Sequence, residues 1–205
     1  MLSELVLDVP VAPWRDLGFV TAPHSDHHHT VIAGVRFVFS GAESGGLTGW
    51  SFDTGSEAVR SVGAVDGIPT TITSVPADVF SHRIEVVSID HVVVMTPSLD
   101  RTCGAIESVL GLPLKRIREV GGGVRQGFHR AGPVILEVVE RPDIADDEPA
   151  HLWGLVFVVD DLDALVNEIG PDKIGAPKQA VQPGRRIATV KRDAGLVVPL
   201  AFMTV

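Results

Sequence analysis

The pattern of apolar and polar positions divides the chain into two halves of different texture. In residues 1–88, short apolar runs alternate with clusters of Gly, Pro, Ser and Asp, as in strands separated by turns. The segment Pro10–Leu17 is predicted to be a turn or one short helix. The strands predicted in this half are Leu5–Val9, His29–Ser40, Leu47–Phe52 and Ile68–Val75.

The second half begins with a regular unit. Val87–Met95 is a nearly continuous run of β-branched residues, which predicts a buried strand. Apolar residues then recur at helical spacing from Leu99 to Leu110, and Gly111 ends this helix. Three further strands are predicted, over Leu114–Val120, Val124–Ala131 and Val134–Glu140. The unit therefore reads β-α-β-β-β.

The same pattern occurs a second time. Trp153–Val159 predicts a strand, and a helix over Leu162–Ile169 follows the N-cap residue Asp161. The last strands are predicted around Lys178–Val181, Arg186–Lys191 and Leu196–Met203. One such unit leaves a face of its small sheet uncovered, so we expect the two units to pack together.

Composition and charge narrow the class of protein. The chain has 205 residues, 45% hydrophobic and 21% charged, as in soluble globular proteins. Its net charge of -9 disfavours a nucleic-acid partner. The single cysteine, Cys103, fits a reducing compartment. With neither a long apolar stretch nor a signal-like N-terminus, we expect a cytoplasmic protein without a membrane segment.

The starts of the two units resemble a known family. The segments IDHVVVMTPSLDR (residues 89–101) and WGLVFVVDDLDAL (residues 153–165) are similar to the vicinal oxygen chelate superfamily of glyoxalases, epimerases, extradiol dioxygenases and bleomycin-resistance proteins. The resemblance implies an α+β fold in which paired βαβββ units over residues 87–205 form a cupped mixed sheet around a pocket. Residues 1–86 are then an extra β-rich segment, either a degenerate βαβββ unit or an unrelated one.

The resemblance also implies a divalent metal on the pocket floor, held by the first and fourth strands of each unit. His91 and Glu137 occupy those positions in the first unit and suit Fe, Mn, Ni, Co or Zn. The second unit has Gly154, and Pro199 or a neighbour, at the corresponding positions, so two ligands are absent. Two alternatives therefore stay open: the protein binds a divalent metal, or it binds no cofactor. His151, His129 and the histidines of residues 24–29 are alternative donors.

Further residues are candidates for the pocket. A buried Glu137 is costly unless it is paired, so it is either a base with a raised pKa or the partner of Arg185 or Arg186. Because neighbouring strand residues face opposite sides, one of these two arginines should face the pocket and bind an anion. Gln126 is a candidate polar wall, and Trp153 either an apolar wall or a core residue.

Three functional hypotheses follow. The first is a lyase, isomerase or dioxygenase that acts on a small oxygenated metabolite, with His91 and Glu137 as metal ligands or acid–base groups. The second is a metal-free protein that binds or sequesters a small molecule, as bleomycin-resistance proteins do. The third is a catalytically inactive relative whose sheets serve dimerisation. In each case the expected assembly is a homodimer, with no nucleic-acid or membrane partner.

Overall fold

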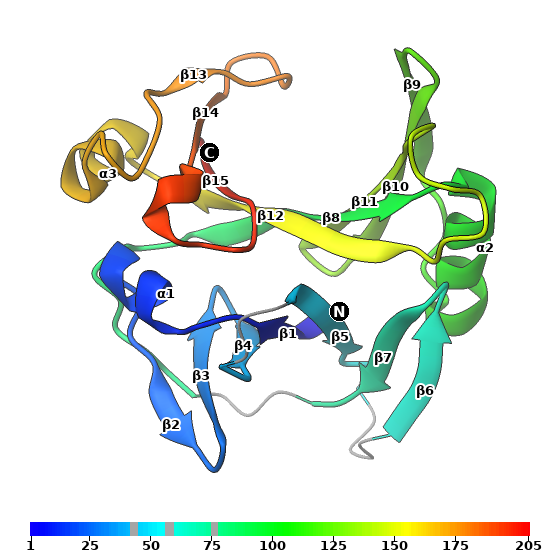
Figure 1. Ribbon diagram of the computed structural model, residues 1–205, viewed down its shortest axis with the longest axis horizontal. Helices are drawn as coiled ribbons and strands as arrows, with labels where there is room; N and C mark the ends of the chain where they lie inside the picture. Colours follow the sequence, from blue (N-terminus) through cyan, green and yellow to red (C-terminus); the bar gives the residue numbers. More distant parts are fainter. Residues whose placement is uncertain (42–44, 56–59, 75–77) are drawn as a thin grey trace.

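Two mixed β-sheets are stacked on one another in the computed structural model, which describes residues 1–41, 45–55, 60–74 and 78–205 (Figure 1). The predicted α+β class with a glyoxalase-like arrangement is confirmed. No helix in the described part of the chain combines the length and the apolar character that crossing a membrane requires.

The C-terminal sheet consists of the two predicted units. Its strand order is β13-β14-β15-β12-β8-β11-β10-β9, and the first and last strands of each unit are parallel neighbours. The first unit comprises β8 (Ser88–Thr96), α2 (Leu99–Leu110), β9 (Arg116–Gly121), β10 (Val124–Ala131) and β11 (Val134–Glu140). The second comprises β12 (His151–Val159), α3 (Leu162–Ile169), β13 (Lys178–Gln179), β14 (Arg186–Thr189), the 3-10 turn η1 (Arg192–Ala194) and β15 (Leu200–Thr204).

The N-terminal sheet has the strand order β2-β3-β4-β1-β5-β7-β6. Its elements are β1 (Leu2–Asp8), α1 (Ala12–Leu17), β2 (Ala22–His24), β3 (His27–Ile32), β4 (Val35–Phe39), β5 (Gly46–Phe52), β6 (Arg60–Val65) and β7 (Ile68–Ile72). The first five have the β-α-β-β-β order, with β1 and β4 parallel. The strands β5, β6 and β7 pair like the first, third and fourth strands of a unit.

Several boundaries in the first half differ from the sequence prediction. The single strand predicted over His29–Ser40 is two strands, because Ala33 and Gly34 form a tight turn with φ of 49° and 79°. The strands β2 and β6 were not predicted. The last predicted strand of this half ends at Ile72, and its expected end, Val75, lies outside the described residues. A domain boundary near residue 86 stays a prediction.

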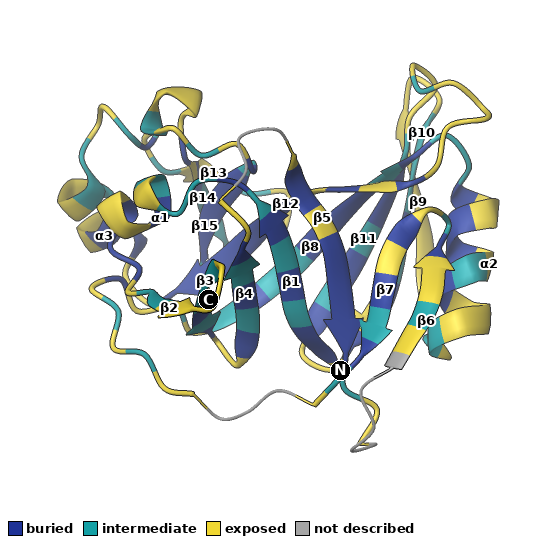
Figure 2. Ribbon diagram, turned by 60° about the horizontal axis from the view of Figure 1, so that its bottom comes forward, coloured by how far each residue is buried: buried dark blue, intermediate teal, exposed yellow. Residues whose placement is uncertain are grey.

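The inner faces of the two sheets share one apolar core. Buried positions follow β1, β5, β8 and β12 through the middle of the molecule (Figure 2). Phe157 on β12 is fully buried, and its ring centroid lies 5.8 Å from that of Phe19 and 5.9 Å from that of Phe37, both of the N-terminal half. The outer face of the C-terminal sheet therefore stays free to form a cup, with β9 and β13 rising at its two ends (Figure 1).

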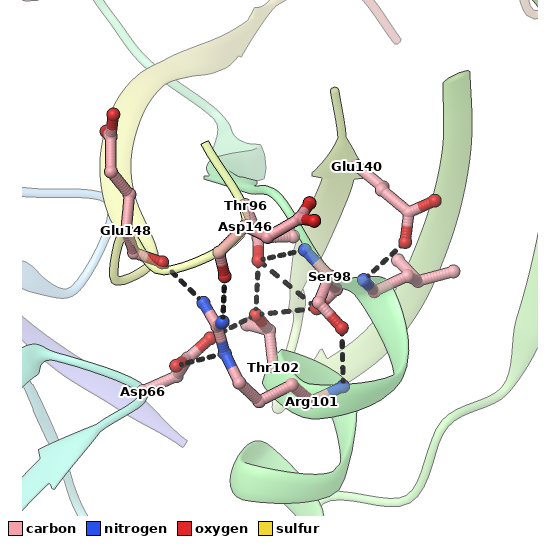
Figure 3. Close-up of polar contacts among 9 residues, drawn as sticks. Asp66, Thr96, Ser98, Arg101, Thr102, Glu140, Asp146 and Glu148 are labelled. Carbon is pink, nitrogen blue, oxygen red and sulfur yellow. Dashed lines mark hydrogen bonds and ion pairs between the residues drawn. The ribbon is translucent and has the colours of Figure 1, made fainter. Parts of the chain in front are cut away.

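A polar cluster fastens the β6–β7 turn to the start of α2 (Figure 3). Asp66 accepts a 2.8 Å hydrogen bond from Arg101 Nε and another from the Thr102 hydroxyl. The same guanidinium donates to the backbone oxygens of Asp146 and Glu148, at 3.0 and 2.6 Å. These contacts tie the N-terminal hairpin to the C-terminal domain and fix the helix behind the cup.

Candidate functional site

A cavity of about 680 Å³ occupies the cup of the C-terminal sheet. Alternation along β11 brings Ile135 and Glu137 into it, while Leu136 and Val138 face the shared core and are fully buried. His91 on the neighbouring strand β8 also lines the cavity. The two residues that sequence analysis placed on the pocket floor thus lie in one cavity.

A β-bulge in β8 adds a second acidic group to this floor. Val156 of β12 pairs with His91 and Phe157 pairs with Ile89, so Asp90 is an extra residue in the ladder. In a regular strand, Asp90 would point away from the side that His91 faces. Because of the bulge, both side chains line the cavity. Asp90 was not predicted from the sequence, because regular alternation would place it on the side of the strand opposite to His91.

The floor residues form a continuous polar array. His91 Nδ1 lies 2.7 Å from Asp90 Oδ2, and His91 Nε2 lies 3.3 Å from Glu137 Oε2. Gln126 donates a 2.6 Å hydrogen bond to the other carboxylate oxygen of Glu137. Arg185 Nη1 lies 2.6 Å from Asp90 Oδ1 and completes the array at its far end. Each member is therefore oriented by its neighbour.

The two carboxyl groups of the array have opposite pKa shifts. Burial raises the pKa of Glu137 above its ordinary value, and the nearby Asp90 carboxylate adds to the increase, although His91, Arg118 and Gln126 oppose it. Burial also acts against ionisation of Asp90, but hydrogen bonds from His91 and Arg185 outweigh it and lower the pKa of Asp90. Asp90 is therefore the permanent anion of the site, and Glu137 is the group suited to exchange a proton.

The second unit contributes no polar group at the related positions. Val156 pairs with His91 and Gly154 pairs with Val93, so the two units are related by an offset of 63 residues and Gly154 is the counterpart of His91. In the fourth strands, Val93 pairs with Glu137 and Val156 pairs with Ala201. The counterpart of Glu137 is therefore Ala201. The sequence placed Pro199 or a neighbour at this position, and the strand register places Ala201 there, two residues further along the chain.

These residues do not fit a resident metal ion. His91 Nε2 and the Glu137 carboxylate are two adjacent donors, and Asp90 orients the imidazole as outer-sphere carboxylates do in metal sites. The opposite side of the floor is apolar, with Val156, Ala201 and Met203 packed together. Within the described residues, no three His, Cys, Asp or Glu side chains are arranged to hold a metal.

Gly154 has a packing reason that the sequence did not reveal. A Cβ atom at this position would lie 2.6 Å from the Pro199 carbonyl oxygen and 3.0 Å from Pro199 Cβ. Neither a histidine nor any other side chain fits there without moving the backbone of the neighbouring strand.

We expect Gly154→Ala to destabilise the protein by about 1–3 kcal/mol, the usual cost of overpacking. Urea unfolding measures this change. The matched control is Gly104→Ala on α2, where no atom lies within 4 Å of the added methyl group. The control should stabilise the helix by about 0.5–1 kcal/mol. Equal stability of Gly154→Ala and the natural protein would contradict the close contact.

The other predicted binding residues are distributed differently. Gln126 lines the cavity, whereas Arg185 binds Asp90 and the Thr204 backbone oxygen. Arg186 forms an ion pair with Asp163 of α3, with its Nη1 2.6 Å from Oδ2, and does not face the cavity. Trp153 is 46% exposed and lines a separate cavity of about 660 Å³ between the sheets. Trp153 shares the parity of Leu155 and Phe157, opposite to Gly154, so strand alternation places it on the side of β12 away from the cup.

The alternative histidine donors lie elsewhere. His129 is buried on the opposite face of β10, with Nδ1 2.8 Å from the Leu112 carbonyl oxygen. His151 lines the same separate cavity as Trp153. Residues 24–29 belong to the N-terminal sheet, where His24, His27 and His29 line a third cavity.

Comparisons with known proteins agree with this architecture. Residues 88–177 match the sequence model of the Glyoxalase/Bleomycin resistance protein/Dioxygenase superfamily, which confirms the resemblance predicted from the sequence. No curated protein matches the chain.

Two solved structures have a similar fold over 99% of this chain. A mutant of 4-hydroxymandelate synthase from Streptomyces coelicolor has a TM-score of 0.68 at 14% identity, over 99% of this chain and 91% of that one. A xylose isomerase-like TIM barrel/4-hydroxyphenylpyruvate dioxygenase fusion protein has a TM-score of 0.69 at 12% identity, over 99% of this chain and 48% of that one. Methylmalonyl-CoA epimerase from Mycobacterium tuberculosis aligns with 61% of this chain and 92% of its own, at 18% identity and a TM-score of 0.49.

Proposed function

We propose, from the premise that residues 88–177 form a domain of the Glyoxalase/Bleomycin resistance protein/Dioxygenase superfamily, that the cup is the active site of a proton-transfer enzyme. Its substrate is a small oxygenated metabolite with a carbonyl group, and its reaction is of the isomerase or lyase type. The observation that carries this proposal is the Asp90–His91–Glu137 array on the floor of an open cavity.

The proposed step uses groups that are already in place. Glu137 takes a proton from the carbon next to the substrate carbonyl, and the electron pair of the C–H bond moves to the carbonyl oxygen. His91 donates its Nδ1 proton to a hydrogen bond with Asp90, and in the imidazolium form its Nε2 donates a hydrogen bond or a proton to the enolate oxygen. Gln126 donates to Oε1 of Glu137, so Oε2, which lies 3.3 Å from His91 Nε2, is the oxygen that takes the substrate proton.

The donor set supports acid–base chemistry without a resident metal. Burial raises the pKa of Glu137, which makes its carboxylate a stronger general base than an ordinary one. The apolar side of the floor, with Val156, Ala201 and Met203, offers a surface for the carbon skeleton of the substrate. The assignment therefore rests on Glu137 as the base and His91 as the electrophile.

A second candidate function is metal-free binding or sequestration of a small molecule. The same apolar half of the floor favours it, because a binding protein needs shape and a few polar anchors rather than a base. A homodimer stays a prediction in both cases.

Proton NMR in D₂O separates the two functions. The probes are a panel of small 2-oxo acids, 2-hydroxy acids and their neutral methyl esters, each incubated with the untagged protein after treatment with a chelator. Protein-dependent loss of a C–H signal next to a carbonyl group supports the enzyme. Saturable binding of panel members without exchange, under conditions where the protein remains folded, would contradict it and favour the binding protein.

A further inference from the structure

We infer that the ligand of the cup carries an oxyanion, a carboxylate or a phosphate, which Arg116 and Arg118 bind on the β9 wall. This inference deepens the proposed function, because it names the substrate class of the same site. It is based on which arginines are paired with other protein groups and which are not.

Most of the arginines whose side chains the structure describes are bound to other protein groups. Acidic residues outnumber basic ones by 26 to 17, so carboxylates are in excess. Of the arginines whose side chains the structure describes, three form neither a hydrogen bond nor an ion pair, and these are Arg116, Arg118 and Arg192. Two of the three line the cup. Leaving two cations unpaired at one cavity is unusual in a molecule with a surplus of anions.

The strand geometry directs both side chains to the same place. Arg116 pairs with Phe128, and Arg118 pairs with Gln126, on the neighbouring strand β10. Residues two apart on a strand face the same side, about 7 Å apart along it, so both guanidinium groups belong to the cavity wall. Arg116 also lies over the Phe128 ring, with 5.2 Å from its central carbon to the ring centroid. That contact orients the guanidinium without neutralising its charge.

The positive charge of the β9 wall acts electrostatically on the residues of the cavity floor. Arg118 lowers the pKa of Glu137, although burial outweighs it, so the two groups interact electrostatically. An oxyanion bound to Arg116 and Arg118 thus leaves the rest of a small molecule next to Glu137 and His91. Planar guanidinium groups match carboxylate and phosphate oxygens in pairs, which a lysine does not do. Lys178 stands on the opposite wall, β13, and adds a third positive charge around the mouth.

Anion titrations test this inference. The probes are malonate, inorganic phosphate and neutral malonamide, followed by isothermal titration calorimetry at low salt. We expect malonate or phosphate to bind and malonamide not to bind, and the stronger of the two anions identifies the oxyanion. Arg118→Gln and Arg116→Gln should each weaken binding about 10- to 100-fold, the worth of a charge-assisted hydrogen bond.

Arg192→Gln is the matched control, because Arg192 is equally unpaired but lies in the separate cavity between the sheets. It removes the same charge and should leave anion affinity within about twofold. Equal losses in all three variants would mean attraction by overall charge and would overturn the inference. So would binding of malonamide as tight as that of malonate.

The two proposals fail in different ways. Anion binding that depends on Arg118, without any C–H exchange, supports the oxyanion site and contradicts the proton-transfer enzyme. Exchange of a neutral ester that Arg116→Gln and Arg118→Gln leave unchanged supports the enzyme and overturns the oxyanion site. Glu137→Gln should retain anion binding, because it removes a negative charge from the floor and leaves the β9 wall intact.

Discussion

Glu137→Gln is expected to lower the rate of C–H exchange by about 10²- to 10⁴-fold, the range for loss of a general base. Gln retains the shape of the side chain and accepts the hydrogen bond from Gln126, but it cannot take up the substrate proton. Binding of the ligand should persist. The measurement is the initial rate of deuterium incorporation by NMR for a substrate from the D₂O panel.

The pH dependence of the same rate has a defined sign. Glu137 acts as a base only when ionised, so the rate should rise as the pH increases through its pKa. Because burial raises this pKa, the midpoint should lie above the ordinary glutamate value of about 4.3. Glu119→Gln is the control, since Glu119 is exposed on β9 outside the cavity. An exchange rate that Glu137→Gln leaves unchanged would contradict the assignment of the base.

Phe157→Ala is expected to destabilise the protein by about 3–5 kcal/mol, the usual cost of truncating a buried phenylalanine. Phe157 is fully buried, and its ring contacts Phe19, Phe37 and Phe202. Two of these partners belong to the N-terminal half and one to the C-terminal sheet. The void left by the truncated side chain therefore lies at the contact between the two sheets. Both sheets should lose stability together.

Thermal and urea unfolding, followed by circular dichroism, measure this effect. The natural protein and Phe157→Ala should each unfold in one transition, displaced to lower temperature in the variant. Trp153→Ala is the control, because this side chain is half-exposed beside a different cavity, and it should cost less than about 1 kcal/mol. Two separate transitions, with one unmoved by Phe157→Ala, would contradict a shared core.

The sequence was sufficient to predict the C-terminal fold, because the strand, helix and repeat patterns all indicated the same arrangement. β-Branched runs, helices with apolar spacing and glycine stops predicted the elements, and the second occurrence of the βαβββ pattern predicted that two units pack together. Strand alternation holds along β11, where Glu137 and Leu136 face opposite sides. Such agreement is expected where a strand has one face in the core and one in a cavity.

The sequence was insufficient where the backbone departs from regular geometry. The bulge in β8 brings Asp90 into the cup, which alternation cannot predict. In the N-terminal half, the Ala33–Gly34 turn is short and lacks the usual Asn-Gly or Asp-Gly signal, so β3 and β4 read as one strand. Arg116 and Arg118 were not predicted as binding residues, because two arginines on an exposed strand are typical of a sheet edge that faces solvent.

The role of Glu137 as the base is tested by a ¹³C NMR titration of the glutamate carboxyl carbons, with Glu137→Gln used to assign the Glu137 signal. We expect this carboxyl to titrate above the ordinary glutamate value and Asp90→Asn to shift its midpoint downward, because Asp90 adds to the increase. A Glu137 midpoint at or below the ordinary value would mean that the carboxylate is stably ionised, and would contradict its role as the base of the cup.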